Sequence, residues 1–101
     1  MIVIKKAAGS VSITGHANYA PHGQDIVCAA ISALVQTLIQ SVEDLCTDTI
    51  SYHLQPGTVE IKYGNLTKDA QLLLDSFFIG VYMIANSYPD NVRVEKHGCK
   101  H

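Results

Sequence analysis

Apolar residues recur at intervals of three and four positions from Val27 to Leu45, and this period restricts the fold more than any other feature of the sequence. The apolar positions are Val27, Ile31, Leu34, Val35, Leu38, Val42 and Leu45. A helix with this spacing has one apolar face that must pack against another element. Asp25 is the best N-cap candidate, so we expect a long helix that begins just after it.

Alternation of apolar and polar residues predicts a β-hairpin on either side of this helix. In the first hairpin, residues 2–6 and 11–15 flank a turn signal at residues 8–10, and His16 is expected to end the second strand. In the second hairpin, the strands surround the turn signal Pro56-Gly57. These later strands are expected at residues 50–54 and 59–63.

A second helix is expected from the N-cap candidate Thr67 to about Ser87, followed by a last strand at residues 92–95. The predicted order is ββαββαβ, and the fold class is α+β. We expect two layers, a mixed sheet with two helices on one face. A chain of 101 residues is too short to supply two separate cores, so residues 1–101 should form one domain.

The second helix has hardly any polar face, because apolar residues occupy most positions from Leu72 to Ile84. A helix that is apolar all round must be covered on both sides. The sheet can cover one side only, and the simplest cover for the other side is a second copy of the chain. We therefore expect a homodimer.

Charge excludes several classes of function. The net charge is −2, so the basic footprint of a nucleic-acid-binding protein is missing. No lysine or arginine lies between Lys6 and Lys62, and this stretch should attract basic ligands. A cysteine phosphatase needs an arginine shortly after its nucleophile, and Arg93 is the only arginine.

The cellular compartment is indicated by the cysteines and by the lengths of the apolar runs. The three cysteines are an odd number without a CxxC pair, which favours reduced thiols. No uninterrupted apolar run approaches the length needed to span a bilayer, and the N-terminal apolar segment is too short for a signal peptide. We expect a cytoplasmic protein that does not bind membranes.

Cys28 falls within the first turn of the first predicted helix. Unpaired backbone N–H groups and the helix dipole at that end stabilise an anion, which lowers a thiol pKa and offers donors to a developing oxyanion. His16 lies twelve residues earlier, and a loop at residues 17–24 can bring its imidazole to the sulfur. The pair would act as nucleophile and acid–base in peptide hydrolysis. From spacing alone, Cys28 is also explained as a packed core residue and His16 as a turn residue.

The segment from 15 to 32 carries a family resemblance. Gly15-His16, a small-residue loop, and the pattern G-x-D-I-V-C-A-A-x-S at residues 23–32 resemble the bacterial ribosomal-processing cysteine proteases, the Prp-type family. The resemblance implies a catalytic dyad of His16 and Cys28, with supporting positions at Gly15, Asp25 and Ser32. It also implies a small homodimer that removes the short N-terminal extension of a large-subunit ribosomal protein.

The third member of the catalytic group stays open, because Asn18 and Asp25 are both placed to orient His16. His22 lies in the loop and is a candidate for substrate contact, although a solvated loop histidine is the simpler interpretation. Cys46 and His53 have no evident partners and are assigned to packing and solvent exposure.

Metal binding and a non-enzymatic role are the remaining alternatives. His97, Cys99 and His101 alternate in the tail, but three ligands on a fraying terminus make a weak zinc site, so we expect no metal and no cofactor. The rival to the protease is a non-enzymatic dimeric binding module, or ribosome-assembly factor, that holds a basic protein while Cys28 is merely packed.

Overall fold

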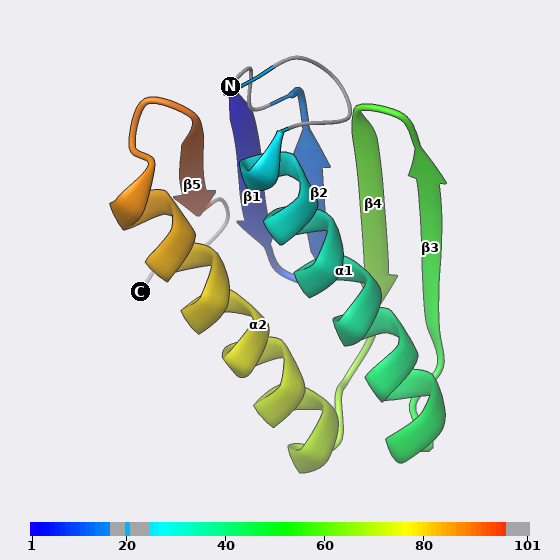
Figure 1. Cartoon of the computed structure of the whole chain (residues 1–101). Coiled ribbons are helices and arrows are strands. Elements are labelled where there is room, and N and C mark those ends of the chain that lie inside the picture. Colours follow the sequence, from blue (N-terminus) through cyan, green and yellow to red (C-terminus); the bar gives the residue numbers. More distant parts are fainter. Residues whose placement is uncertain (17–19, 21–24, 97–101) are drawn as a thin grey trace.

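The structure is a computed structural model that describes residues 1–16, 20 and 25–96. Its element order is ββαββαβ, as predicted (Figure 1). The elements are β1 (Ile2–Ala7), β2 (Ser10–Thr14), α1 (Ile26–Leu45), β3 (Ile50–Gln55), β4 (Thr58–Tyr63), α2 (Lys68–Ser87) and β5 (Val92–Lys96).

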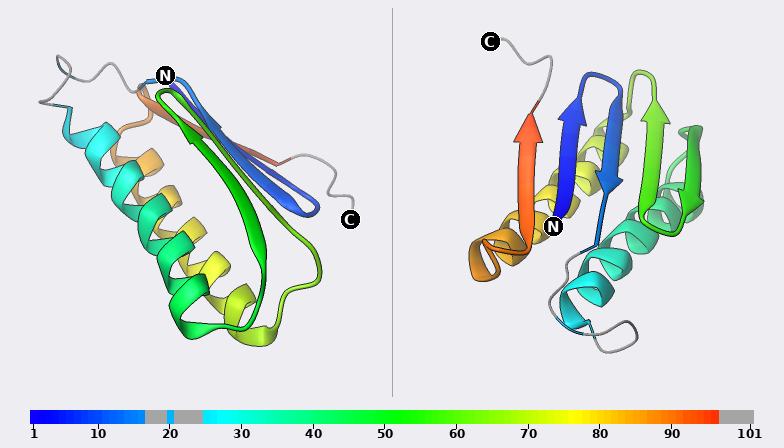
Figure 2. Two further views of the ribbon diagram at one scale, coloured as in Figure 1. Left: turned by 90° about the vertical axis from the view of Figure 1, so that its right-hand side faces the viewer. Right: turned by 90° about the horizontal axis from the view of Figure 1, so that it is seen from above.

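The five strands form one mixed sheet in the order β3-β4-β2-β1-β5. β1 pairs in parallel with β5, and the other neighbouring strands are antiparallel. Both helices lie on the same side of the sheet and pack against each other (Figure 2). The prediction of a two-layer α+β fold with a mixed sheet is confirmed.

Side-chain caps explain where the two helices begin. The Asp25 carboxylate accepts the backbone N–H groups of Val27 and Cys28 at the start of α1. Thr67 caps α2 by accepting the N–H of Ala70, and its own hydroxyl and N–H donate to Asp48. Both N-caps were predicted, because a short polar side chain directly before an apolar periodic run satisfies orphan amides of the first turn.

The core lies between the helices and the inward face of the sheet. Val11 and Ile61 are almost completely buried on neighbouring strands, and Val27 and Val81 meet them from the two helices. The Lys6 ammonium lies 4.7 Å from the centre of the Phe78 ring, so the aliphatic part of this lysine covers the edge of the core. The buried apolar side chains of the described residues therefore form one hydrophobic cluster that joins the sheet and both helices.

Two apolar regions stay exposed in the single chain. On α2, the side chains of Leu72, Ile79 and Met83 are 68%, 63% and 65% exposed. On β3, which forms one edge of the sheet, Tyr52 and Leu54 face the helix side, yet α1 covers only part of them. The alternation predicted for β3 is correct, but its edge position leaves the inward face half open.

The expectation from apolar run length needs correction. Both α1 and α2 have the length and overall hydropathy of a membrane-spanning segment, although polar residues interrupt each of them. One face of each helix packs on the sheet, which accounts for part of this apolar composition, and exposed residues such as Leu72, Ile79 and Met83 add to it on α2. Length and composition by themselves therefore do not exclude a membrane.

Candidate active site

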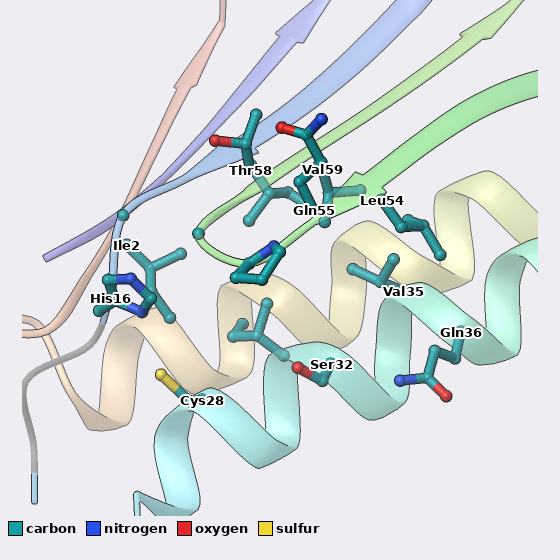
Figure 3. Close-up of a pocket in the computed structure, with 15 residues that line it drawn as sticks. Ile2, His16, Cys28, Ser32, Val35, Gln36, Leu54, Gln55, Thr58 and Val59 are labelled. Carbon is teal, nitrogen blue, oxygen red and sulfur yellow. The ribbon is translucent and has the colours of Figure 1, made fainter. Parts of the chain in front are cut away.

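A pocket of about 320 Å³ opens at the end of the sheet where α1 begins. The end of β2, the first three turns of α1 and the β3–β4 turn line it (Figure 3). His16 and Cys28 are both among the lining residues, so the fold brings the two predicted dyad members to one cavity. The walls near them are apolar and come from Ile2, Ile13, Ile31, Val35 and Val59.

Gly15 sets the direction in which the chain leaves β2. Its φ is +92°, a conformation that favours glycine, and a Cβ atom at this position would overlap the carbonyl oxygen of Met1. The Gly15 N–H donates to the carbonyl of Gly57 over 2.9 Å. We had expected His16 to end the second strand. Instead, β2 ends at Thr14, and His16 lies two residues beyond the strand. Gly15 thus positions His16 through the conformation of the backbone.

Gly57 supports the imidazole from the β3–β4 turn. A Cβ atom on Gly57 would lie 3.0 Å from Nε2 of His16, and the φ of Gly57 is +78°. Any larger residue would therefore meet the ring and strain the turn. The sequence marked Pro56-Gly57 only as a turn, because nothing local reveals that this turn returns to the end of β2.

Cys28 is half-buried in the first turn of α1 and contacts the edge of the hydrophobic core. Figure 3 shows its sulfur on the pocket side of the helix, directed toward the side where His16 lies. Ser32 follows one helical turn later, is exposed, and lines the same pocket. The two interpretations of Cys28 are therefore compatible, since one side of the residue packs while the sulfur borders the cavity.

The amides at the start of α1 are engaged, which corrects the expectation that they are unpaired. Oδ1 of Asp25 accepts the N–H of Val27 over 3.0 Å and the N–H of Cys28 over 2.9 Å. A carboxylate at this position compensates the positive end of the helix dipole. In this structure these two donors are therefore not available to an oxyanion, and Asp25 acts as a helix cap.

Other residues that the sequence singled out lie away from the pocket or beyond the described residues. Cys46 is partly buried at the C-terminal end of α1, and burial together with the carboxylates of Asp48 and Asp69 raises the pKa of its thiol, which disfavours the thiolate. His53 is exposed on β3, opposite Glu60 in the β3–β4 register. Asn18, His22, His97, Cys99 and His101 lie outside the described residues.

Most of the other residues that line the pocket were not predicted as site residues, and Gln36 and Leu54 are two of them. Gln36 lines the pocket two helical turns after Cys28, and Leu54 lines it from β3. Gln36 belongs to the row of positions 28, 32 and 36, a signal that spacing along α1 does contain. Within residues 1–16, 20 and 25–96, no three histidine, cysteine or acidic side chains cluster as metal ligands would.

Comparison with known proteins places this fold and pocket in a family. A protein-family model described as cysteine protease Prp matches residues 1–93. The chain is 32% identical over 95 residues to the ribosomal processing cysteine protease Prp of Bacillus subtilis, covering 84% of this chain and 82% of that protein. The protein of the same name from Staphylococcus aureus is 30% identical over 87 residues, covering 83% and 82%.

A solved structure gives the same result at the level of the fold. The crystal structure of the S. aureus ribosomal processing protease Prp, in complex with a covalently linked product peptide, matches with a TM-score of 0.92 and 24% sequence identity. The match covers 96% of this chain and 100% of that chain. The resemblance predicted from residues 15–32 is confirmed, and the non-enzymatic alternative loses its support. The chain belongs to the family of ribosomal processing cysteine proteases called Prp and is a cysteine endopeptidase.

Proposed function

We propose that this chain uses Cys28 as nucleophile and His16 as acid and base to remove the N-terminal extension of a large-subunit ribosomal protein. One observation carries the proposal. His16 and Cys28 are twelve positions apart in the sequence, yet both line the pocket where α1 begins. A thiol and an imidazole in one pocket are the two groups that cysteine-dependent peptide hydrolysis requires.

The proposed reaction has two steps. In the first, the Cys28 thiolate attacks the carbonyl carbon of the scissile peptide bond, and the protonated His16 gives its proton to the leaving amine, which departs with the C-terminal fragment. The N-terminal fragment is then held as a thioester. In the second step, neutral His16 takes a proton from water, the hydroxide attacks the thioester, and the Cys28 thiolate leaves.

Charge supports a basic protein as substrate. Over residues 7–61 the sequence contains no lysine or arginine but includes Asp25, Glu43, Asp44, Asp48 and Glu60. Ribosomal proteins bind RNA phosphates and are rich in lysine and arginine, so their attraction to this acidic stretch is favourable. The names of the B. subtilis and S. aureus relatives also refer to ribosomal processing.

The exposed face of α2 supports a homodimer. Leu72, Ile79 and Met83 lie at seven- and four-residue intervals, which places them along one face of the helix. Burial of this apolar surface against the same surface of a second chain would contribute about 25 cal/mol per Å². A second chain related by a two-fold axis beside α2 would cover the apolar face of this helix that the sheet leaves exposed. The proposed place of action is the cytoplasm, where thiols stay reduced.

Mass spectrometry of a cleavage reaction tests the proposal. The chain is incubated with a large-subunit ribosomal protein carrying its N-terminal extension, and two fragments whose masses sum to the substrate plus one water are expected. Cys28→Ala and His16→Ala should each abolish the fragments. Cys46→Ala and His53→Ala are matched controls away from the pocket and should keep wild-type cleavage. Full activity of His16→Ala would remove the proposed base, and an intact substrate would contradict the assigned reaction.

A further inference from the structure

We propose that Gln36 binds the main chain of the substrate about three to four residues away from the scissile bond. The inference rests on the proposed function, because it assumes that Cys28 attacks a peptide in this pocket. It adds a substrate-binding residue to the wall of the pocket, at a distance from the reacting atoms.

The first argument is the row of side chains along α1. Cys28, Ser32 and Gln36 are four residues apart, so they follow one another on one face of the helix, and all three line the pocket. Leu54 and the β3–β4 turn form the opposite wall (Figure 3). The pocket is therefore elongated along α1, with Cys28 at one end and Gln36 at the other.

The second argument is the hydrogen-bonding state of Gln36. Its exposed side chain makes no hydrogen bond to any residue in the part of the chain that the structure describes. Gln40 and Gln71 behave differently, since each donates from Nε2 to an aspartate four residues later, Asp44 and Asp75, over 2.9 Å. The amide of Gln36 is thus free to bind a ligand, and a primary amide offers the donor and acceptor that complement a peptide group.

The third argument is length. Gln36 follows Cys28 by eight residues on α1, a rise of about 12 Å at roughly 1.5 Å per residue. An extended peptide advances about 3.3 Å per residue, so the same span takes between three and four residues. Beyond Gln36 the hydroxyl of Tyr52 donates to Glu43 across the space between β3 and α1. Neither Tyr52 nor Glu43 lines the pocket, whose last lining residue on α1 is Gln36.

Leu54 explains why a peptide would lie along this path. Its side chain is 49% exposed in the single chain and borders the pocket opposite α1. A substrate side chain packed on Leu54 would leave the neighbouring peptide group beside Gln36. The groove therefore combines one apolar contact with one polar contact, as peptide-binding grooves commonly do.

The test compares Gln36→Leu, which keeps the size of the side chain and removes its hydrogen bonds, with Gln40→Leu one turn later. The substrates are a peptide with about six residues on each side of the bond cut in the ribosomal protein, and two versions cut back to about two residues on one side or the other. Gln36→Leu should raise KM for the long peptide about 3- to 10-fold, as expected for one neutral hydrogen bond, with kcat unchanged. Gln40→Leu should cleave like the wild type.

One of the two shortened peptides should abolish the difference between Gln36→Leu and the wild type, and it identifies the side of the scissile bond that Gln36 binds. Binding of the long peptide to the inactive Cys28→Ala chain, with and without Gln36→Leu, should show the same ratio in Kd. An equal KM for wild type and Gln36→Leu, or a difference that survives both truncations, would overturn the inference while the protease assignment stands. A wild-type chain that cleaves none of the peptides would overturn the proposed function, and this inference with it.

Discussion

The imidazole of His16 lies directly against the backbone of Gly57, because a Cβ atom on that glycine would be only 3.0 Å from Nε2 of the ring. The Gly15 N–H to Gly57 carbonyl bond holds the same two segments together. The second hairpin is therefore part of the active site, although its sequence carries no catalytic residue type at the turn.

Substitution Gly57→Ala should displace His16 by a few tenths of an ångström. We expect kcat to fall about tenfold. A displacement of 1 Å can lower the rate about 100-fold, and this displacement is smaller. Strain at positive φ should also lower the free energy of unfolding by about 1 kcal/mol. Steady-state kinetics and urea denaturation measure the two effects.

Two glycines control this experiment. Gly9 has a φ of +76° in the β1–β2 turn, at the opposite end of these strands, so Gly9→Ala should destabilise the fold without changing kcat. Among residues 1–16, 20 and 25–96, no atom beyond its chain neighbours lies within 4 Å of a Cβ on Gly64, so Gly64→Ala should keep wild-type kinetics. If Gly57→Ala changed stability alone, the contact with His16 would have no role in catalysis.

Removal of the Asp25 cap should destabilise α1. Asp25→Ala leaves the amides of Val27 and Cys28 without their acceptor, and the free energy of unfolding should fall by about 1 kcal/mol. Asp25→Ser keeps a capping oxygen and should recover most of this loss. Chemical denaturation measures all three chains, and equal midpoints for Asp25→Ala and wild type would contradict the capping role.

Asp48 should make the free energy of unfolding depend on pH in the acidic range. Hydrogen bonds from the side chain and backbone of Thr67 hold the pKa of Asp48 below its ordinary value of 3.8. Its ionised form is therefore favoured by folding, and this stabilisation is complete above pH 3.8 and is lost as the pH falls through the lower folded pKa. Asp48→Asn should show a shallower loss of stability below pH 3.8 in urea titrations. Asp90→Asn, a matched change at an exposed position, should keep the wild-type dependence of stability on pH. The same wild-type dependence in Asp48→Asn would contradict the role given to Asp48.

A charge on α2 should break the proposed dimer. Ile79→Lys places an ammonium at the centre of the exposed apolar face, where pairing with a second copy would bury it. In sedimentation velocity, the wild type should have twice the mass of one chain, and Ile79→Lys should have the mass of one chain. Leu45→Lys, at an equally exposed site at the end of α1, should leave the dimer intact. A monomeric wild type at micromolar concentration would show that α2 has another cover.

Local patterns in the sequence determined the seven elements, both N-caps and the family, because alternation, helical period and short motifs involve neighbours along the chain. Asp25 and Thr67 precede apolar runs, and Gly15-His16 with Cys28 forms the motif of the family. These features need no knowledge of which strands pair.

Only the tertiary structure decided how those pieces meet. The strand order places the Gly57 turn against His16, puts Leu54 on an exposed edge and lines one pocket with Cys28 and Gln36. It also showed that Asp25 takes the amides expected to stay open. Contacts between residues far apart in the chain depend on how the sheet and the helices pack together. The periodicity within a single segment does not determine this packing.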